Sequence, residues 1–303
     1  MESLLSLAFD NLSSFDGGKI KKGLKQVEGL LAQICLLGPS SPRKHAADHG
    51  REREQPSRKV LADLSGDPAF REFFKLQEGF EWNIAQRLLT TLDWLVVRGG
   101  DGQYDLLIVN ALDLIQGALL LHPASKALFS RSVHMNLLLD LLEPINCPAI
   151  QSATIITLVV ALLDMPQNTR VFEQLDGLLT VTSLFKSRET GREVKFRLTE
   201  FLYFYLTPET PSIPRADARL SAAAPGLLQR SPSKLATAFG ASASASGGGS
   251  REGEGRERGQ EGEDGATLSV EDKKLFVDRY LPGVVDELLK DLDTYKPFGG
   301  VLS

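Results

Sequence analysis

Apolar positions recur with helical spacing along much of this chain, and the pattern is strongest between residues 153 and 206. A long apolar run ends at Leu163 and is followed by Pro166, and proline suits the first position of a helix, where no N–H is needed. Asp176-Gly177 interrupts the short segment that follows, and a third apolar run covers residues 178–185. The stretch predicts a unit of a long helix, a short helix and a third helix.

The same order of residues occurs 43 positions upstream. Pro123 corresponds to Pro166, and Phe129 corresponds to Phe172. Three-helix units with a period slightly above forty residues are typical of armadillo and HEAT repeats. Each unit has an apolar face that only its neighbours bury, so we predict an all-α, armadillo/HEAT-like α-solenoid.

A weaker third copy starts at Pro68. Phe74 lies six residues after this proline, as Phe129 and Phe172 do after theirs. Phe80 lies twelve residues after it, where the other two units have Met135 and Leu178. We therefore expect Phe74, Phe129 and Phe172 to be equivalent core residues.

Composition divides the chain into helical and polar segments. Residues 38–56 and 207–267 contain too few large apolar residues to form a core, and the second of these segments is of low complexity. The expected organisation is N-terminal helices (1–37), a disordered linker (38–56), armadillo-like repeats (57–206), a disordered low-complexity linker (207–267), and a C-terminal capping helix and tail (268–303).

Within these segments the apolar spacing predicts individual helices. Asp16 is a suitable N-cap for the second of them. The predicted helices cover residues 2–12, 17–37, 78–98, 104–122, 192–206 and 268–293.

The predicted helix at 192–206 is apolar on two opposite faces. One face carries Val194, Leu198, Phe201 and Tyr205, and the other carries Phe196 and Tyr203 with Phe204 between the two faces. A helix of this kind must be covered on both sides. The second cover is either the chain's own C-terminal helix or another protein, so Phe196, Tyr203 and Phe204 are candidate partner-binding residues.

The charge, the apolar runs and the cysteines bear on whether the protein binds nucleic acid, spans a membrane or belongs to a reducing compartment. The net charge of −5 does not indicate nucleic-acid binding. The longest uncharged apolar run is much shorter than the ~20 residues of a membrane span, and the N-terminal sequence does not resemble a signal peptide. Two cysteines, Cys35 and Cys147, fit a reducing compartment such as the cytoplasm.

No residue pattern indicates catalysis or a cofactor. The sequence contains no nucleophile motif, no dinucleotide fingerprint and no phosphate loop, and Gly17-Gly18-Lys19 lacks the spacing of one. His45 and His49 are spaced like a metal pair, but no further ligand completes a site. We expect no enzyme activity, no metal, no cofactor and no small-molecule substrate.

Two further features have alternative interpretations. Four lysines lie in the first turns of the second predicted helix (Lys19, Lys21, Lys22, Lys25), and they form either a solvated face or a site for an acidic segment. Ser41 and Ser231 each begin an S-P-x-K motif in a predicted linker, the pattern preferred by cyclin-dependent kinases, so both are candidate phosphorylation sites.

Several long strings are specific enough to suggest a family. They are KGLKQVEGLLAQICL (22–36), DPAFREFFKLQEGFEWNIA (67–85), PAIQSATIITLVVALLDMPQNTRVFEQLDGLLTVTSLFKSR (148–188), VKFRLTEFLYFYLTPE (194–209) and the terminal PFGG (297–300). These strings resemble a fungal family of septation initiation network components. That family shares its historical name with an unrelated dual-specificity phosphatase, whose Cys-x5-Arg signature is missing from this sequence.

The resemblance implies a non-catalytic subunit that binds a germinal-centre-type Ser/Thr kinase. The pair would act in the cytoplasm and at the spindle pole body, where it promotes septum formation and cytokinesis. The alternative is a helical-repeat adaptor that works without a kinase. The resemblance does not extend to residues 210–266.

Overall fold

The computed structural model describes residues 1–36, 64–99, 102–209 and 267–295, which all belong to one compact unit. The predicted linker at 38–56, nearly all of the second linker and the terminal PFGG lie outside these residues. Every regular element in the described part is a helix, as predicted. The elements are α1 (Glu2–Leu12), α2 (Gly17–Leu36), α4 (Pro68–Glu78), α5 (Ile84–Arg98), α6 (Asp105–Leu121), η1 (Pro123–Ser130), α7 (Ser132–Leu141), α8 (Pro148–Leu162), α9 (Pro166–Gln174), α10 (Gly177–Lys186), α11 (Arg192–Leu206), α13 (Val270–Asp278) and α14 (Val284–Tyr295).

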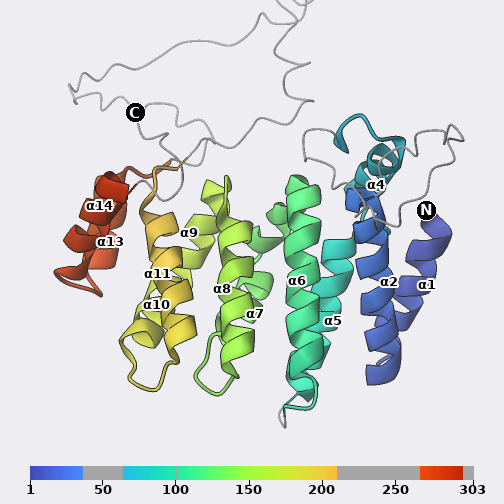
Figure 1. Cartoon of the computed structure of the whole chain (residues 1–303), viewed down its shortest axis with the longest axis horizontal. Coiled ribbons are helices and arrows are strands. Elements are labelled where there is room, and N and C mark those ends of the chain that lie inside the picture. The colour runs from blue at the N-terminus through green and yellow to red at the C-terminus, as the bar shows by residue number, and fades with distance from the viewer. Residues whose placement is uncertain (37–63, 100–101, 210–266, 296–303) are drawn as a thin grey trace, which may run out of the picture. The chain divides into compact units, whose positions relative to one another are not determined.

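The long helices α2, α6, α8 and α11 form one row in which each contacts the next (Figure 1). Between successive long helices the chain forms a short helix (α4, η1 or α9) and a third helix (α5, α7 or α10). The short helices also contact one another in order, α4 with η1 and η1 with α9. This arrangement is the predicted solenoid-like fold, in which each unit is covered by its neighbours.

The 43-residue period is confirmed in the two central units. Pro123 and Pro166 each begin the short helix, and Phe129 and Phe172 are completely buried. Gly177 begins α10 directly beside Phe172, and a Cβ atom there would lie 2.2 Å from its ring. Packing therefore requires the glycine after Asp176, whereas the left-handed backbone of the turn falls on Asp176 itself (φ +56°).

A polar seam accompanies the short helices. Asn168, which is fully buried in α9, donates from Nδ2 to the carbonyls of Lys126 (2.9 Å) and Ala161 (2.7 Å). The equivalent residue of η1, Ser125, accepts from Nδ2 of Asn83 at 2.9 Å. The bonds to Lys126 and to Ser125 join consecutive units. The two bonds of Asn168 also give buried backbone carbonyls the donors that they need.

The first unit differs from the prediction. Phe73, not Phe74, is fully buried, while Phe74 is half-buried with its ring 4.6 Å from that of His122. The prediction that Phe74 is equivalent to Phe129 and Phe172 is therefore wrong. The inward face of α4 carries Phe73 and Gln77, one helical turn apart, and the Gln77 side chain accepts the N–H of Ile84 at 2.7 Å. Phe80 follows the end of α4 and is 82 % exposed.

The helix predicted over 78–98 is also wrong at its start. The chain turns after α4, and α5 begins at Ile84, where the Oδ1 atom of Asn83 accepts the N–H of Gln86 at 2.9 Å as an N-cap. Trp82 thus lies in the turn rather than in a helix. Asp67 caps α4 in the same way, and Asp16 caps α2 as predicted, with a bond of 2.8 Å in each case.

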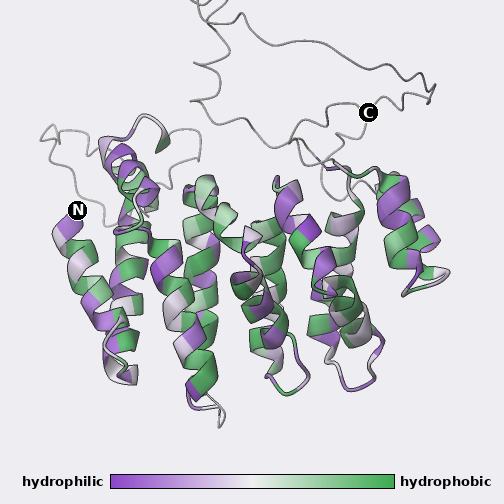
Figure 2. Ribbon diagram, turned by 180° about the vertical axis from the view of Figure 1, so that it is seen from behind, coloured by the Kyte–Doolittle hydropathy of each residue, from purple (hydrophilic) through white to green (hydrophobic). Residues whose placement is uncertain are grey.

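Helix α8 provides the most apolar part of the core. It has no charged residue, and eleven of its side chains are buried. Figure 2 shows hydrophobic and hydrophilic residues alternating along the helices of the row. Among the described residues no single helix is long and apolar enough to span a membrane. Only the pair α6 and η1, which are bent by 119° relative to each other, reaches that length and apolar composition when the two are counted together.

We expect truncation of the repeated phenylalanine to be costly. Phe129→Ala should reduce the free energy of unfolding by about 3–5 kcal/mol, since it removes a fully buried ring from a packed core. The matched variant Phe80→Ala, at an exposed site, should change it by less than about 0.5 kcal/mol. Urea unfolding of both variants tests this, and equal effects would contradict the assignment of the core.

The buried His122 should make stability depend on pH. Burial lowers its pKa from 6.5 to about 4, and its Nδ1 atom lies 2.8 Å from Ser125 Oγ. Because the folded pKa lies below the unfolded value, the unfolded chain binds the extra proton between these limits. Stability present above pH 6.5 is therefore lost as the pH falls towards 4, by about 3 kcal/mol in total.

The non-titrating variant His122→Asn isolates this contribution from the carboxylates that titrate over the same range. The difference in unfolding free energy between wild type and variant should change with pH between 6.5 and 4. Parallel pH profiles of the two proteins would show that His122 is not the responsible group.

Candidate functional site

Helix α11 closes the row of long helices and packs its first face as predicted. Val194, Leu198, Phe201 and Tyr205 are all buried, and the ring of Phe201 meets Phe172 of α9 edge to face at 5.6 Å. Leu202 and Leu206, which lie between the two apolar faces, are buried as well. The second face is covered only in part within this chain, since Tyr203 is half-buried.

The cover is the C-terminal segment, as expected, but it consists of two helices instead of one. Both α13 and α14 contact α11 (Figure 1). The predicted helix over 268–293 is interrupted between Asp278 and Val284, where Pro282 removes a backbone donor and Gly283 has φ +82°. Because of this break, the inward face of α14 is not continuous with that of α13. In α14, Val285 is fully buried and Val284 is only half-buried.

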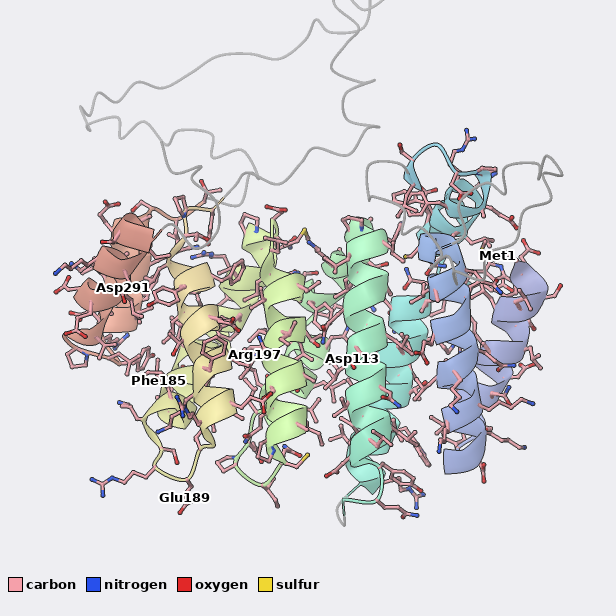
Figure 3. The ribbon with its side chains drawn as sticks, in the orientation of Figure 1. Met1, Asp113, Phe185, Glu189, Arg197 and Asp291 are labelled. Carbon is pink, nitrogen blue, oxygen red and sulfur yellow. The ribbon has the colours of Figure 1, made fainter. Side chains whose placement is uncertain are left out.

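The three predicted partner-binding residues lie in different environments. Phe196 is 59 % exposed, and the guanidinium carbon of Arg197 lies 5.9 Å from the centre of its ring. Tyr203 and Phe204 are half-buried, and the Tyr203 hydroxyl donates to Oδ2 of Asp291 on α14 at 3.1 Å. In Figure 3, Asp291 lies on the α14 side of α11 and Arg197 on the side towards α8.

The predicted phosphorylation sites, Ser41 and Ser231, lie outside the described residues. No group of three or more histidine, cysteine or acidic side chains within the described ranges is arranged to hold a metal ion. Cys35 and Cys147 are both half-buried thiols.

A buried ionic cluster, which the sequence did not reveal, holds the C-terminal helices on the repeats. Its members are Arg170 and Glu173 of α9, Tyr205 of α11, Glu209, and Lys273 of α13. Arg170 pairs with Glu173 (2.7 Å) and with Glu209, while Lys273 Nζ lies 3.4 Å from Glu209 Oε1. The Tyr205 hydroxyl donates to Glu173 Oε1 at 2.5 Å. Because these residues are distant in sequence, only the fold brings them together.

Burial determines the electrostatics of this cluster. The side chains of Glu209 and Lys273 are each only 5 % exposed. Burial raises the pKa of Glu173, against the hydrogen bond from Tyr205, and it lowers the pKa of Lys273, against the attraction of Glu209. Burial also raises the pKa of Tyr205 far above its ordinary value. Two cations and two carboxylates balance, so removing any one leaves a buried charge without a partner.

The cluster also holds two distant parts of the backbone together. Glu209 Oε2 accepts the N–H of Leu268 at 2.9 Å, and Lys273 Nζ donates to the carbonyl of Thr207, the C-cap residue of α11, also at 2.9 Å. A cation at this position is favourable because it faces the negative end of the helix dipole. Glu209, the last described residue before the gap, is therefore held directly beside Leu268, which follows the gap.

A cavity of about 150 Å³ adjoins the cluster. Its wall combines the corner between α8 and α9 with the end of α11, including Leu163, Pro166 and Phe204. Cofactors and metabolites occupy pockets of about 300–1,000 Å³, so this cavity is too small to be such a site. The cluster residues Glu209 and Lys273 line this cavity and are paired with each other.

The chain is similar to a known protein family over almost its whole length. A family model described as "Cell division control protein 14, SIN component" matches residues 1–298. The chain belongs to the Cell division control protein 14 family. The "Cell division control protein 14" of Schizosaccharomyces pombe is 30 % identical over 221 residues, which cover 70 % of this chain and 82 % of that protein. No solved structure matches.

Membership in the Cell division control protein 14 family confirms the resemblance seen in the sequence. The family is a component of the septation initiation network (SIN) in fungal cell division, and it is not a known enzyme family. The match runs through both the repeats and the C-terminal helices, so the two parts described above are features of one family member.

The ionic cluster predicts a large effect of one neutralising substitution. Glu209→Gln should reduce the free energy of opening of α13 and α14 by about 3–5 kcal/mol, because Arg170 and Lys273 lose their shared carboxylate in a buried site. Hydrogen exchange of the α13 and α14 amides measures this free energy.

The matched control is Glu200→Gln, which removes the half-exposed partner of Arg197 on the same helix. Its effect should be less than about 0.5 kcal/mol, as for surface ion pairs in general. Unchanged protection in Glu209→Gln would show that the cluster does not hold the C-terminal helices.

Proposed function

We propose that this chain is a non-catalytic subunit that binds a germinal-centre-type Ser/Thr kinase of the septation initiation network. In this role it promotes septum formation and cytokinesis, in the cytoplasm and after recruitment to the spindle pole body. The observation that carries the proposal is the family match over residues 1–298. The stacked helices support it, since repeats of this kind offer extended surfaces to other proteins.

The proposed contact with the kinase is a helix of the kinase's extension beyond its catalytic domain, bound along α11. Helix recognition of this type requires an apolar side chain that is reachable from solvent. Phe196 meets this requirement, with Arg197 beside its ring to add a charged contact. Tyr203 and Phe204 belong to the same proposed surface, but α14 bonds to Tyr203, so a partner that reaches them must displace or join the C-terminal helices.

Phe196→Ser tests this proposal without disturbing the core. Buried aromatic anchors of protein interfaces contribute about 2 kcal/mol or more, so the amount of co-purified kinase should fall at least about ten-fold. The melting temperature should stay unchanged, because the side chain is exposed in the free protein. Affinity purification from dividing cells, followed by quantification of the kinase, provides the measurement.

The matched control is Leu275→Ser, at an exposed apolar position of α13. It should retain the kinase. Equal retention by Phe196→Ser would remove α11 as the contact surface, whereas a stoichiometric partner other than a kinase in the wild-type purification would favour the adaptor function instead.

A further inference from the structure

The turn between α1 and α2 holds an exposed aromatic side chain in an unfavourable backbone conformation. Phe15 has φ +55° and is 69 % exposed. Bulky residues rarely adopt this left-handed conformation, which glycine and asparagine tolerate far better. Burial does not explain the presence of phenylalanine here, since most of the side chain contacts solvent. Conformational strain of this kind is often found at functional sites.

Phe15 belongs to a row of three aromatic rings from separate parts of the chain. Its ring centre lies 5.9 Å from that of Trp94 of α5, and Trp94 lies 5.7 Å from Tyr104, which precedes α6. Gly17 completes the arrangement, because a Cβ atom there would lie 2.9 Å from the Tyr104 ring. We name Phe15, Trp94 and Tyr104 the aromatic platform. All three remain at least partly exposed.

A basic face of α2 continues from the aromatic platform. Lys21 and Lys25 follow Gly17 at successive intervals of four residues, which places all three on one side of the helix. Lys19, Lys21, Lys22 and Lys25 are all exposed, and none forms an ion pair with another described residue. Lysines spaced by four residues repel each other, so this face is unfavourable without a negatively charged neighbour.

The acidic residues of this region do not neutralise the lysines. Asp16 accepts the backbone N–H of Lys19 at 2.8 Å as the N-cap of α2, and Glu28 lies beyond Lys25 on the same helix without an ion pair to it within the described residues. The positive charge is therefore open to a partner from outside.

We propose that the aromatic platform and the basic face of α2 together bind an acidic protein segment that carries an apolar side chain. Charge complementarity identifies the acidic part, and the exposed ring of Phe15 identifies the apolar part. The net charge of −5 and the restriction of the lysines to one helix favour a peptide over nucleic acid or a membrane, which need broader positive surfaces. The site lies on α2, which contacts α6 rather than α11, so it is separate from the proposed kinase surface.

The experiment uses the full chain and a fluorescein-labelled peptide of alternating glutamate and leucine with one terminal phenylalanine. Fluorescence anisotropy should show binding that weakens with salt, since exposed charges are screened. A peptide with glutamine in place of glutamate should not bind. The double variant Lys21→Glu/Lys25→Glu should lower the affinity at least about ten-fold. The control Lys75→Glu/Lys290→Glu has the same net charge but changes exposed lysines of α4 and α14, and it should bind like wild type.

Phe15→Asn tests the aromatic part, because asparagine tolerates the left-handed backbone. The affinity should fall several-fold, while the melting temperature stays the same or rises. Equal losses in the two double variants, unchanged binding by Phe15→Asn, or binding of phosphatidylserine vesicles without binding of the peptide would each overturn the proposal.

Discussion

The stacking of one helical unit on the next is the interaction on which the whole structure depends. No long helix in the described row buries its apolar faces within its own unit, and α8, which has no charge, is the extreme case. Sideways contacts from α2 to α6, α8 and α11 bury these faces in a continuous core. The burial of apolar surface is favourable in proportion to its area, but it has no preferred direction. It therefore drives the units to associate without determining how each unit is oriented on the next. Polar contacts such as those of Asn168 provide the direction.

A stack of this type must also close its two ends. At the first end, α1 packs on α2, so that the row begins with a helix pair. At the other end, α13 and α14 cover α11 with a mixture of apolar contacts and the ionic cluster around Glu209. Buried ion pairs contribute little net stability but are selective for one arrangement of their partners. In this protein they select one position for helices that arrive from a distant part of the chain.

The sequence was informative where a pattern is local and uninformative where contacts are distant. Proline at a helix start and phenylalanine six residues later identified the two central units, because both residues act within one short helix. In the first unit the buried residue is Phe73 instead of Phe74, because α4 turns Phe73 and Gln77 inwards and Gln77 bonds to the start of α5. Residue spacing alone does not reveal these bonds. The apolar second face of α11 predicted a cover. The ionic cluster that secures this cover joins residues 170 and 273, for which the sequence has no periodic signal.

The hydrogen bond from Leu268 to Glu209 has a consequence for protein engineering and for divergence among relatives. Since this bond brings Glu209 and Leu268 together, a change in the number of residues between them does not require α11 and α13 to move apart. For a flexible insert, the closure entropy would grow only with the logarithm of its length. A fluorescent protein or an affinity module inserted between these two residues, or a difference in length among related chains there, would be compatible with α13 packed on α11.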